Sequence, residues 1–274
     1  MDSFIANLKT RDYADGKMLA ATEDGVGIVI FNQPEKRNAM SVEMWEGLGT
    51  ILDGFSADPK IRSIVLTGAG EKAFVSGADI SQFEKRRANA DDQRNYNEMI
   101  AVNRVKYEDF SKPMIARIQG FCLGGGLAIA MQADIRIASM DSQFGIPAAR
   151  LGIAYGPESV IQLVNLVGPA HARMILYTAK RMNAAEAERI GLINKAVPVE
   201  ELSAAVLDIA RAISENAPLS IAASKLTIGE VLKDAQDRNM EAVRQIGVTC
   251  FNSADYEEGR RAFMEKRRPV FLGR

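Results

Sequence analysis

Three consecutive glycines lie between an apolar run and a helix-forming run in the middle of the chain. The segment reads GFCLGGGLAIAM over residues 120–131. Glycine destabilises regular structure because it loses more backbone entropy on folding than any other residue. A run of three is therefore expected where a turn needs close packing or presents its backbone to a ligand.

The runs on either side of this turn alternate between strand and helix. Apolar strands are predicted at 114–119 and, after the short helix that follows the glycines, at 134–138. Upstream, 19–31 reads as two short strands around a Glu-Asp-Gly turn, and 61–67 as a further strand. Strands that alternate with helices in this way predict an α/β core.

One upstream helix has a defined start and a defined apolar face. Ser41 is a suitable N-cap. Apolar residues at spacings of four, three and four follow it, so they share one face of the helix: Met44, Leu48, Ile51 and Phe55. The polar segment 84–111 is also predicted to be helical.

The composition excludes several classes of protein. The 274 residues are 47% hydrophobic, which is enough for a large core. The formal net charge is −1, and the basic cluster at 266–268 is short, so we expect no nucleic-acid partner. Two cysteines and one histidine make neither a disulfide framework nor a familiar zinc set, so no metal is expected.

The sequence also predicts where the protein is found. The N-terminus carries acidic residues and no apolar stretch of signal-peptide length. No segment approaches the ~20 apolar residues of a membrane span. Because cysteines are few, a reduced, cytoplasmic compartment is expected.

The sequence pattern changes near Pro198. Leu202, Val206, Ile209 and Ile213 lie at helical spacing after it. We therefore expect 1–198 to form the core, with the ligand site, and 199–274 to form an all-helical C-terminal region. Helices with apolar faces must pack on the core or on a neighbouring subunit.

The glycine turn could also carry chemistry. The first four N–H groups of a helix have no partner within it, and the helix dipole adds partial positive charge there. Such a turn can hold an anion or an oxygen that becomes negative during a reaction. The phosphate-binding patterns GxxxxGK[ST] and GxGxxG are both absent. Close packing of helix on strand, without a ligand, is the alternative.

A second glycine turn shifts the balance toward a ligand. The segment KAFVSGADI, residues 72–80, also follows a strand and could direct an N–H group outward. Two such donors are what an oxyanion hole needs when a thioester carbonyl becomes an enolate. A purely structural protein would leave the presence of two such turns unexplained.

Both turns belong to longer motifs. KAFVSGADI and KPMIARIQGFCLGGGLAIAMQADIRIAS closely resemble the enoyl-CoA hydratase/isomerase (crotonase) superfamily. The resemblance continues through FGIPAARLGI, LVGPAHARMILYTAKRMNAAEAERIGLINKAVP and EEGRRAFMEKRRPVF, and covers roughly residues 18–272. It implies an α/β fold, a spiral of ββα units, with a C-terminal helical region that forms trimers. These trimers often pair into hexamers.

The resemblance also implies a substrate and a site. It implies a coenzyme A thioester, with coenzyme A as part of the substrate and no permanently bound cofactor. The N–H groups of Ala78 and Gly125 would form the oxyanion hole, and two C-terminal residues would reach a neighbouring subunit's coenzyme A. The positions that match the coenzyme A groove and those two residues are Lys36, Arg37, Ser76, Ala78, Ile80, Phe263 and Lys266. Lys36 and Arg37 read equally well as a solvated turn, and Phe263 as a helix-packing residue.

The family pattern is broken at two positions. The hydratases of the family carry one glutamate two residues after the glycine turn and another after the FG-x-P turn, and together these activate water and supply a proton. Here the two positions are Ala128 and Ala148. Neither alanine can move a proton, so ordinary hydration is not expected without substitutes.

Two nearby residues are candidates for the missing groups. Glu158 matches a segment from which other branches of the superfamily draw an aspartate, although it could merely cap a helix. Tyr155 could donate to a substrate oxygen or simply pack beside the neighbouring glycine. Ser76 and Ser159 are weaker candidates, and Asp79 reads as structural.

Two functions remain open at this stage. The first is a lyase or isomerase that acts on acyl-CoA through an enolate held at Ala78 and Gly125, with hydration, double-bond isomerisation, decarboxylation and C–C cleavage as possible reactions. The second, motivated by the loss of both glutamates, is a non-catalytic subunit that binds acyl-CoA.

Overall fold

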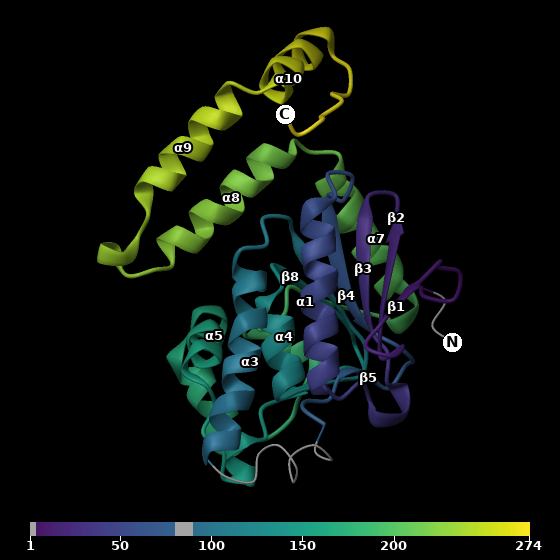
Figure 1. Cartoon of the computed structure of the whole chain (residues 1–274), viewed down its shortest axis with the longest axis vertical. Helices are drawn as coiled ribbons and strands as arrows, with labels where there is room; N and C mark the ends of the chain where they lie inside the picture. Colours follow the sequence, from purple (N-terminus) through teal and green to yellow (C-terminus); the bar gives the residue numbers. More distant parts are fainter. Residues whose placement is uncertain (1–3, 80–89) are drawn as a thin grey trace.

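The computed structural model describes residues 4–79 and 90–274 and contains two β-sheets surrounded by helices (Figure 1). The larger sheet has seven strands in the order β1-β2-β3-β4-β6-β8-β11. Its first three strands pair antiparallel, and its remaining pairs are parallel. The bounds of these strands are Arg11–Tyr13 (β1), Met18–Glu23 (β2), Val26–Phe31 (β3), Ser63–Gly68 (β4), Met114–Ile118 (β6), Ile135–Ser139 (β8) and Lys195–Val197 (β11).

The smaller sheet has four short strands in the order β10-β9-β7-β5. Strands β5, β7 and β9 are parallel, and β10 is antiparallel to β9. Their bounds are Ala73–Val75 (β5), Phe121–Leu123 (β7), Gln143–Gly145 (β9) and Met182–Asn183 (β10).

Successive strands alternate between the two sheets, and a helix follows each pair. Strands β4, β6 and β8 lie in the larger sheet, and the strands that follow them, β5, β7 and β9, lie in the smaller one. The helices after these pairs are α3 (Ala90–Glu108), α4 (Gly125–Gln132) and α5 (Pro157–Thr178), and α5 is kinked at Gly168. This repetition confirms the predicted α/β spiral of ββα units.

The central strands of the larger sheet, β3, β4 and β6, are buried on both faces, which explains their almost continuously apolar sequences. In β4, Ile64 and Leu66 face the main core, whereas Val65 faces a second apolar cluster. Side chains on a strand alternate between faces, so the two clusters lie on opposite sides of the sheet. Helix α7 (Leu202–Ser214) covers the second cluster with Leu202, Val206 and Ala210.

Helix α1 (Val42–Ala57) covers part of the opposite face. The Ser41 side chain accepts a hydrogen bond from the N–H of Met44, so the predicted N-cap is confirmed. Met44, Leu48 and Ile51 are fully buried, as their spacing predicted. Within residues 4–79 and 90–274, the remaining connections contain α6 (Ala184–Arg189) and four short 3-10 helices: Pro34–Lys36 (η1), Ala148–Leu151 (η3), Val199–Glu201 (η4) and Ala235–Asp237 (η5).

The C-terminal region is helical, as predicted, and most of it extends away from the sheets. Figure 1 shows α8 (Pro218–Val231), α9 (Met240–Phe251) and α10 (Ala254–Glu265) as a projecting arm. We call residues 218–274 the arm. Helix α7 also lies beyond the predicted boundary at 198, but it packs on the sheet. Large apolar side chains remain exposed on the arm, among them Ile228, Leu232, Val248, Phe251, Phe263 and Met264.

The last residues of the chain fold back and bind two buried carboxylates of α10. Asp255 accepts hydrogen bonds from the N–H groups of Leu272 and Gly273, and Glu258 accepts one from Val270. On the core, Arg62 donates to the carbonyl of Phe271 at 2.6 Å. The tail therefore connects the arm to the loop before β4.

No helix in residues 4–79 and 90–274 is both long and apolar enough to cross a membrane.

Candidate active site

The two glycine turns meet at one edge of the smaller sheet. One turn leaves β5 and contains Gly77 and Ala78, and the other leaves β7 and opens α4 at Gly125. Because β5 and β7 are parallel neighbours, their carboxyl ends lie together. A carbon placed at the Cβ position of Gly125 would lie 3.8 Å from the nitrogen of Ala78, so a side chain there would touch the other turn.

The three glycines of the second turn are there for different reasons. Gly124 has φ 52° and ψ −116°, a conformation that residues with a side chain rarely adopt. At Gly126, a Cβ would lie 2.0 Å from the carbonyl oxygen of Val75, so the helix could not pack on β5. At Gly125, a Cβ would meet only ordinary contacts of 3.8 Å or more. The backbone conformation therefore requires Gly124 and packing requires Gly126, whereas Gly125 leaves open the space beside Ala78.

Backbone pairing directs the Ala78 N–H group away from the Met40 segment. Ala78 forms an isolated parallel bridge with Met40, in which Met40 donates to the carbonyl of Gly77 and Asp79 donates to Met40. Both bonds lie on one side of the segment, so the Ala78 N–H points to the other. Within the described residues, neither this N–H group nor that of Gly125 has an acceptor. Both residues are partly exposed, so a ligand oxygen can reach them.

Three residues predicted for the coenzyme A groove lie beside this turn. The N–H of Ser76 donates to the carbonyl of Arg37 at 3.1 Å. The Lys36 ammonium group donates to Asp79 at 2.8 Å, and this bond raises the pKa of Lys36. The Arg37 guanidinium lies over the Phe121 ring, 5.2 Å from its centroid. Ile80, the remaining groove residue, lies outside the described residues.

A residue that the sequence analysis missed holds this loop in place. Asn38 is fully buried and has φ 56°, a left-handed conformation that asparagine tolerates. Its side chain accepts from the N–H of Gln33 and donates to the carbonyls of Ala69 and Ala73. It thereby joins the loop before α1 to the start of β5. The signal was an asparagine directly after the charged pair Lys36-Arg37.

The two alanines at the expected glutamate positions both lie near the glycine turn. The Ala128 N–H donates to the carbonyl of Gly124 at 3.0 Å, which places Ala128 one helical turn into α4. Ala148 starts η3, and its neighbour Pro147 lies 3.6 Å from the Cβ position of Gly124. Both alanines are partly exposed. This part of the site therefore has methyl groups at the two positions where the family resemblance predicted glutamates.

Of the two candidate substitutes, Tyr155 contacts the turn. Its hydroxyl donates to the carbonyl of Gly124 at 3.2 Å. Burial raises the pKa of Tyr155, so the phenol stays protonated. Glu158 is exposed in the first turn of α5, and its carboxylate lies 3.5 Å from the Cβ position of Gly156. Its catalytic role stays a prediction.

The two predicted C-terminal contacts lie on the arm. Phe263 is 84% exposed, and Lys266 ends α10 in a left-handed conformation. Figure 1 places α10 at the far end of the arm from α4. Their predicted contact with coenzyme A therefore concerns a neighbouring subunit.

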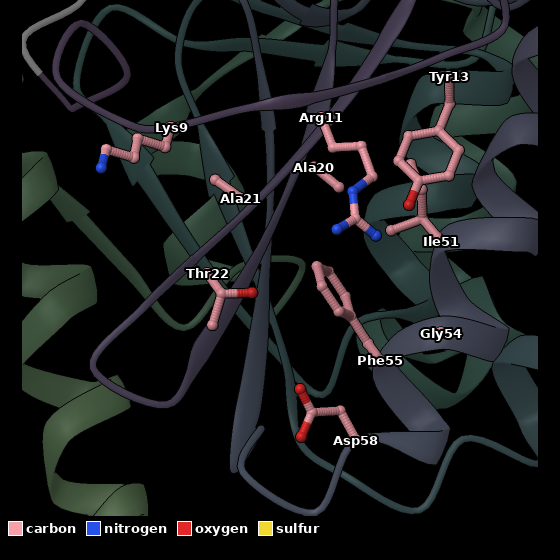
Figure 2. A pocket seen from close by; sticks show the side chains of 10 residues that line it. All are labelled: Lys9, Arg11, Tyr13, Ala20, Ala21, Thr22, Ile51, Gly54, Phe55 and Asp58. Atoms are coloured by element: carbon pink, nitrogen blue, oxygen red, sulfur yellow. The ribbon is translucent and has the colours of Figure 1, made fainter.

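A separate cavity of about 330 Å³ lies between the N-terminal hairpin and α1 (Figure 2). Arg11 and Tyr13 of β1 extend toward it, with Phe55 of α1 below them. Its lining includes Lys9 and Asp58 but no residue of either glycine turn. It is therefore distinct from the site at Ala78 and Gly125.

The chain is similar to known sequences over most of its length. The sequence pattern of the enoyl-CoA hydratase/isomerase family matches residues 21–274. The chain is 37% identical over 248 residues to a short-chain-enoyl-CoA hydratase from Clostridium acetobutylicum, which is 90% of this chain and 94% of that protein. It is 35% identical over 252 residues to a crotonyl-CoA hydratase from Syntrophomonas wolfei, covering 92% and 96% of the two chains.

Solved structures are similar in the same way. A crystal structure of an enoyl-CoA hydratase/carnithine racemase from Magnetospirillum magneticum superposes with a TM-score of 0.90 at 33% identity, covering 94% of this chain and 96% of that one. An enoyl-CoA hydratase from Bacillus anthracis superposes with a TM-score of 0.85 at 29% identity, covering 94% and 100%.

Proposed function

Because the chain belongs to the enoyl-CoA hydratase/isomerase family, we propose that it binds a coenzyme A thioester and stabilises its enolate at Ala78 and Gly125. The observation that carries this proposal is the close approach of the two glycine turns, at which both N–H groups lack an acceptor within the described residues. Hydration of short-chain enoyl-CoA is the activity in the names of the sequence relatives.

The two N–H groups would act on the thioester oxygen. As the enolate forms, this oxygen gains negative charge, and hydrogen bonds to it become stronger than those to the neutral carbonyl. The dipole of α4 adds to this effect at Gly125. Removing one donor of such a pair typically costs ~3 kcal/mol of transition-state stabilisation.

The alanines at positions 128 and 148 help to decide which reaction proceeds through the enolate. Hydration needs a group that removes a proton from water, and isomerisation needs one that removes a proton from carbon. Neither Ala128 nor Ala148 can do so. Decarboxylation of a malonyl-type thioester breaks the bond to the carboxylate carbon, releases carbon dioxide and leaves the electron pair in the enolate, so the oxyanion hole alone assists the bond-breaking step. Water then supplies the proton that the enolate carbon takes up. We therefore favour decarboxylation over hydration, isomerisation and C–C cleavage.

A panel of thioesters tests the proposal. The purified chain is incubated with crotonyl-CoA, a 3-enoyl-CoA and malonyl-type thioesters, and the products are separated by chromatography. We expect turnover, fastest with a malonyl-type thioester. Binding of all three without turnover would contradict the proposal and support the non-catalytic acyl-CoA-binding subunit.

We also propose that the arm joins subunits into a homotrimer or a dimer of trimers. The exposed apolar side chains of α8, α9 and α10 support this, because patches of this kind mark contacts between proteins. In such an assembly, Phe263 and Lys266 could reach the coenzyme A bound to a neighbour.

A further inference from the structure

One peptide plane carries both the Gly125 N–H group and the Gly124 carbonyl. In a trans peptide, these two groups point in opposite directions and turn together. Any contact that holds the carbonyl of Gly124 therefore also sets the direction of the Gly125 N–H. This geometry makes the partners of the Gly124 carbonyl relevant to catalysis.

Two donors hold that carbonyl. The N–H of Ala128 donates to it at 3.0 Å as the first hydrogen bond of α4, and the hydroxyl of Tyr155 donates at 3.2 Å. The first bond belongs to the helix itself. The second comes from the segment before α5, 31 residues away in the chain.

Tyr155 is itself held by Ser159. Burial raises the pKa of Tyr155, and a hydrogen bond with Ser159 lowers it by a smaller amount. The phenol has a single proton, which it donates to the carbonyl of Gly124, so the Ser159 hydroxyl is the donor in the bond to the Tyr155 oxygen. The chain of donors therefore runs from Ser159 through Tyr155 to Gly124. Hydrogen bonds in such a chain polarise one another.

We propose that Tyr155 is a positioning residue that aims the Gly125 N–H at the thioester oxygen. This inference rests on the proposed function and names a residue on which the oxyanion hole depends. Tyr155 acts by two effects: its hydroxyl fixes the tilt of the peptide plane, and its donation to the carbonyl makes the Gly125 N–H a stronger donor. Both effects matter most when negative charge develops, so Tyr155 increases kcat and leaves KM largely unchanged.

The test compares Tyr155→Phe with Tyr177→Phe, an exposed tyrosine at the other end of α5. We expect Tyr155→Phe to lower kcat by about 10- to 100-fold, less than the 10²–10³-fold loss typical for a deleted donor, with KM nearly unchanged. The carbonyl stretching band of a bound, ¹³C-labelled thioester should also move toward its position in water. Tyr177→Phe should match the wild type in both measurements.

Several outcomes would overturn the inference. An unchanged kcat would do so, as would a lower kcat with an unshifted carbonyl band, which would mean that Tyr155 contacts another part of the substrate. If Tyr155→Phe does not fold, Ser159→Ala provides the test. We expect the carbonyl band to shift in the same direction by a smaller amount, and an unshifted band would contradict the inference. Wild-type enzyme without turnover on the thioester panel would instead contradict the proposed function, and the carbonyl band would still test Tyr155.

Discussion

The ammonium group of Lys36 and the carboxylate of Asp79 form an ion pair at 2.8 Å that joins the loop after β3 to the segment carrying Ala78. The Lys36 side chain is 47% exposed and that of Asp79 is 8% exposed, so only the lysine remains open to solvent. The hydrogen bond to Asp79 raises the pKa of Lys36, which keeps the lysine charged. Lys36 therefore holds the segment of Ala78 in place, in addition to any contact with coenzyme A.

This ion pair predicts coupling between two substitutions. Lys36→Met and Asp79→Asn should each lower kcat, because each removes the link between the loop and Ala78. The double variant should be little worse than the more damaging single variant, since both act through one contact. Steady-state kinetics on the preferred thioester provide the measurement. Effects on kcat that simply multiply would show that the two residues act separately.

Alanine substitutions at the neighbouring residues Gly125 and Gly126 should affect different properties, activity at Gly125 and stability at Gly126. Gly126→Ala would place a methyl group against the carbonyl of Val75 and should reduce the free energy of unfolding by about 1–3 kcal/mol or more. Gly125→Ala meets no close atom, so its stability should stay near that of the wild type. Its methyl group would instead stand beside the Ala78 N–H and reduce kcat/KM by roughly 10²-fold, the loss expected for one donor.

Denaturant unfolding measures the stability of Gly125→Ala and Gly126→Ala, and steady-state kinetics measure their activity. Gly54→Ala in α1 is the control, because a Cβ there meets no atom within 4 Å. It should be neutral or stabilising by up to about 1 kcal/mol, since alanine favours helix more than glycine. Full activity of Gly125→Ala would show that the space beside Ala78 is not used by the substrate.

The tail of the chain predicts a pH dependence of stability. Hydrogen bonds from Arg267, Arg261 and the N–H of Val270 hold the pKa of Glu258 well below its usual value of 4.5. A depressed pKa means that the carboxylate stabilises the fold above the unfolded-state pKa, and that this stabilisation is lost as the pH falls through the folded-state pKa. Glu258→Gln should therefore lower Tm at neutral pH. The difference in Tm between this variant and the wild type should become smaller below about pH 4.5.

Thermal unfolding between pH 3 and pH 7 measures this difference. Glu241→Gln is the matched control, because the ion pair of Glu241 with Arg244 is exposed and should contribute little. A constant difference between Glu258→Gln and the wild type at every pH would contradict the assigned role of the carboxylate.

If the arm joins subunits, assembly should depend on the exposed apolar side chains of the arm. Val248→Glu would place a charge on an apolar, 51% exposed position of α9, and should shift the protein from trimer toward monomer. Thr249→Glu adds the same charge at the next position, about 100° around the helix, and should leave the assembly intact. Sedimentation equilibrium gives the mass of each. A wild-type monomer would refute the proposed assembly directly.

Local patterns predicted the elements of the core, and the family resemblance implied that the two glycine turns meet. The alternation of strands and helices and the N-cap at Ser41 are properties of short segments, so the sequence contains them fully. The positions of Ala78 and Gly125 followed from family motifs, and the parallel pairing of β5 and β7 brings them together.

Contacts between distant segments could not be predicted in this way. The helical spacing of Leu202 and Val206 indicates a buried face but not the element that buries it. The sequence therefore did not distinguish α7, which packs on the sheet, from α8, which lies on the arm. The bond from Tyr155 to Gly124 depends on how the start of α5 packs against α4. The binding of the tail by Asp255 and Glu258 likewise appears only once the chain is folded.

A crystal structure of the protein with a bound acyl-CoA tests the central claim most directly. The account predicts that the thioester oxygen accepts hydrogen bonds from the backbone nitrogens of both Ala78 and Gly125, at the usual 2.7–3.1 Å or so for an oxyanion hole. A bound thioester whose carbonyl points away from both nitrogens would contradict it.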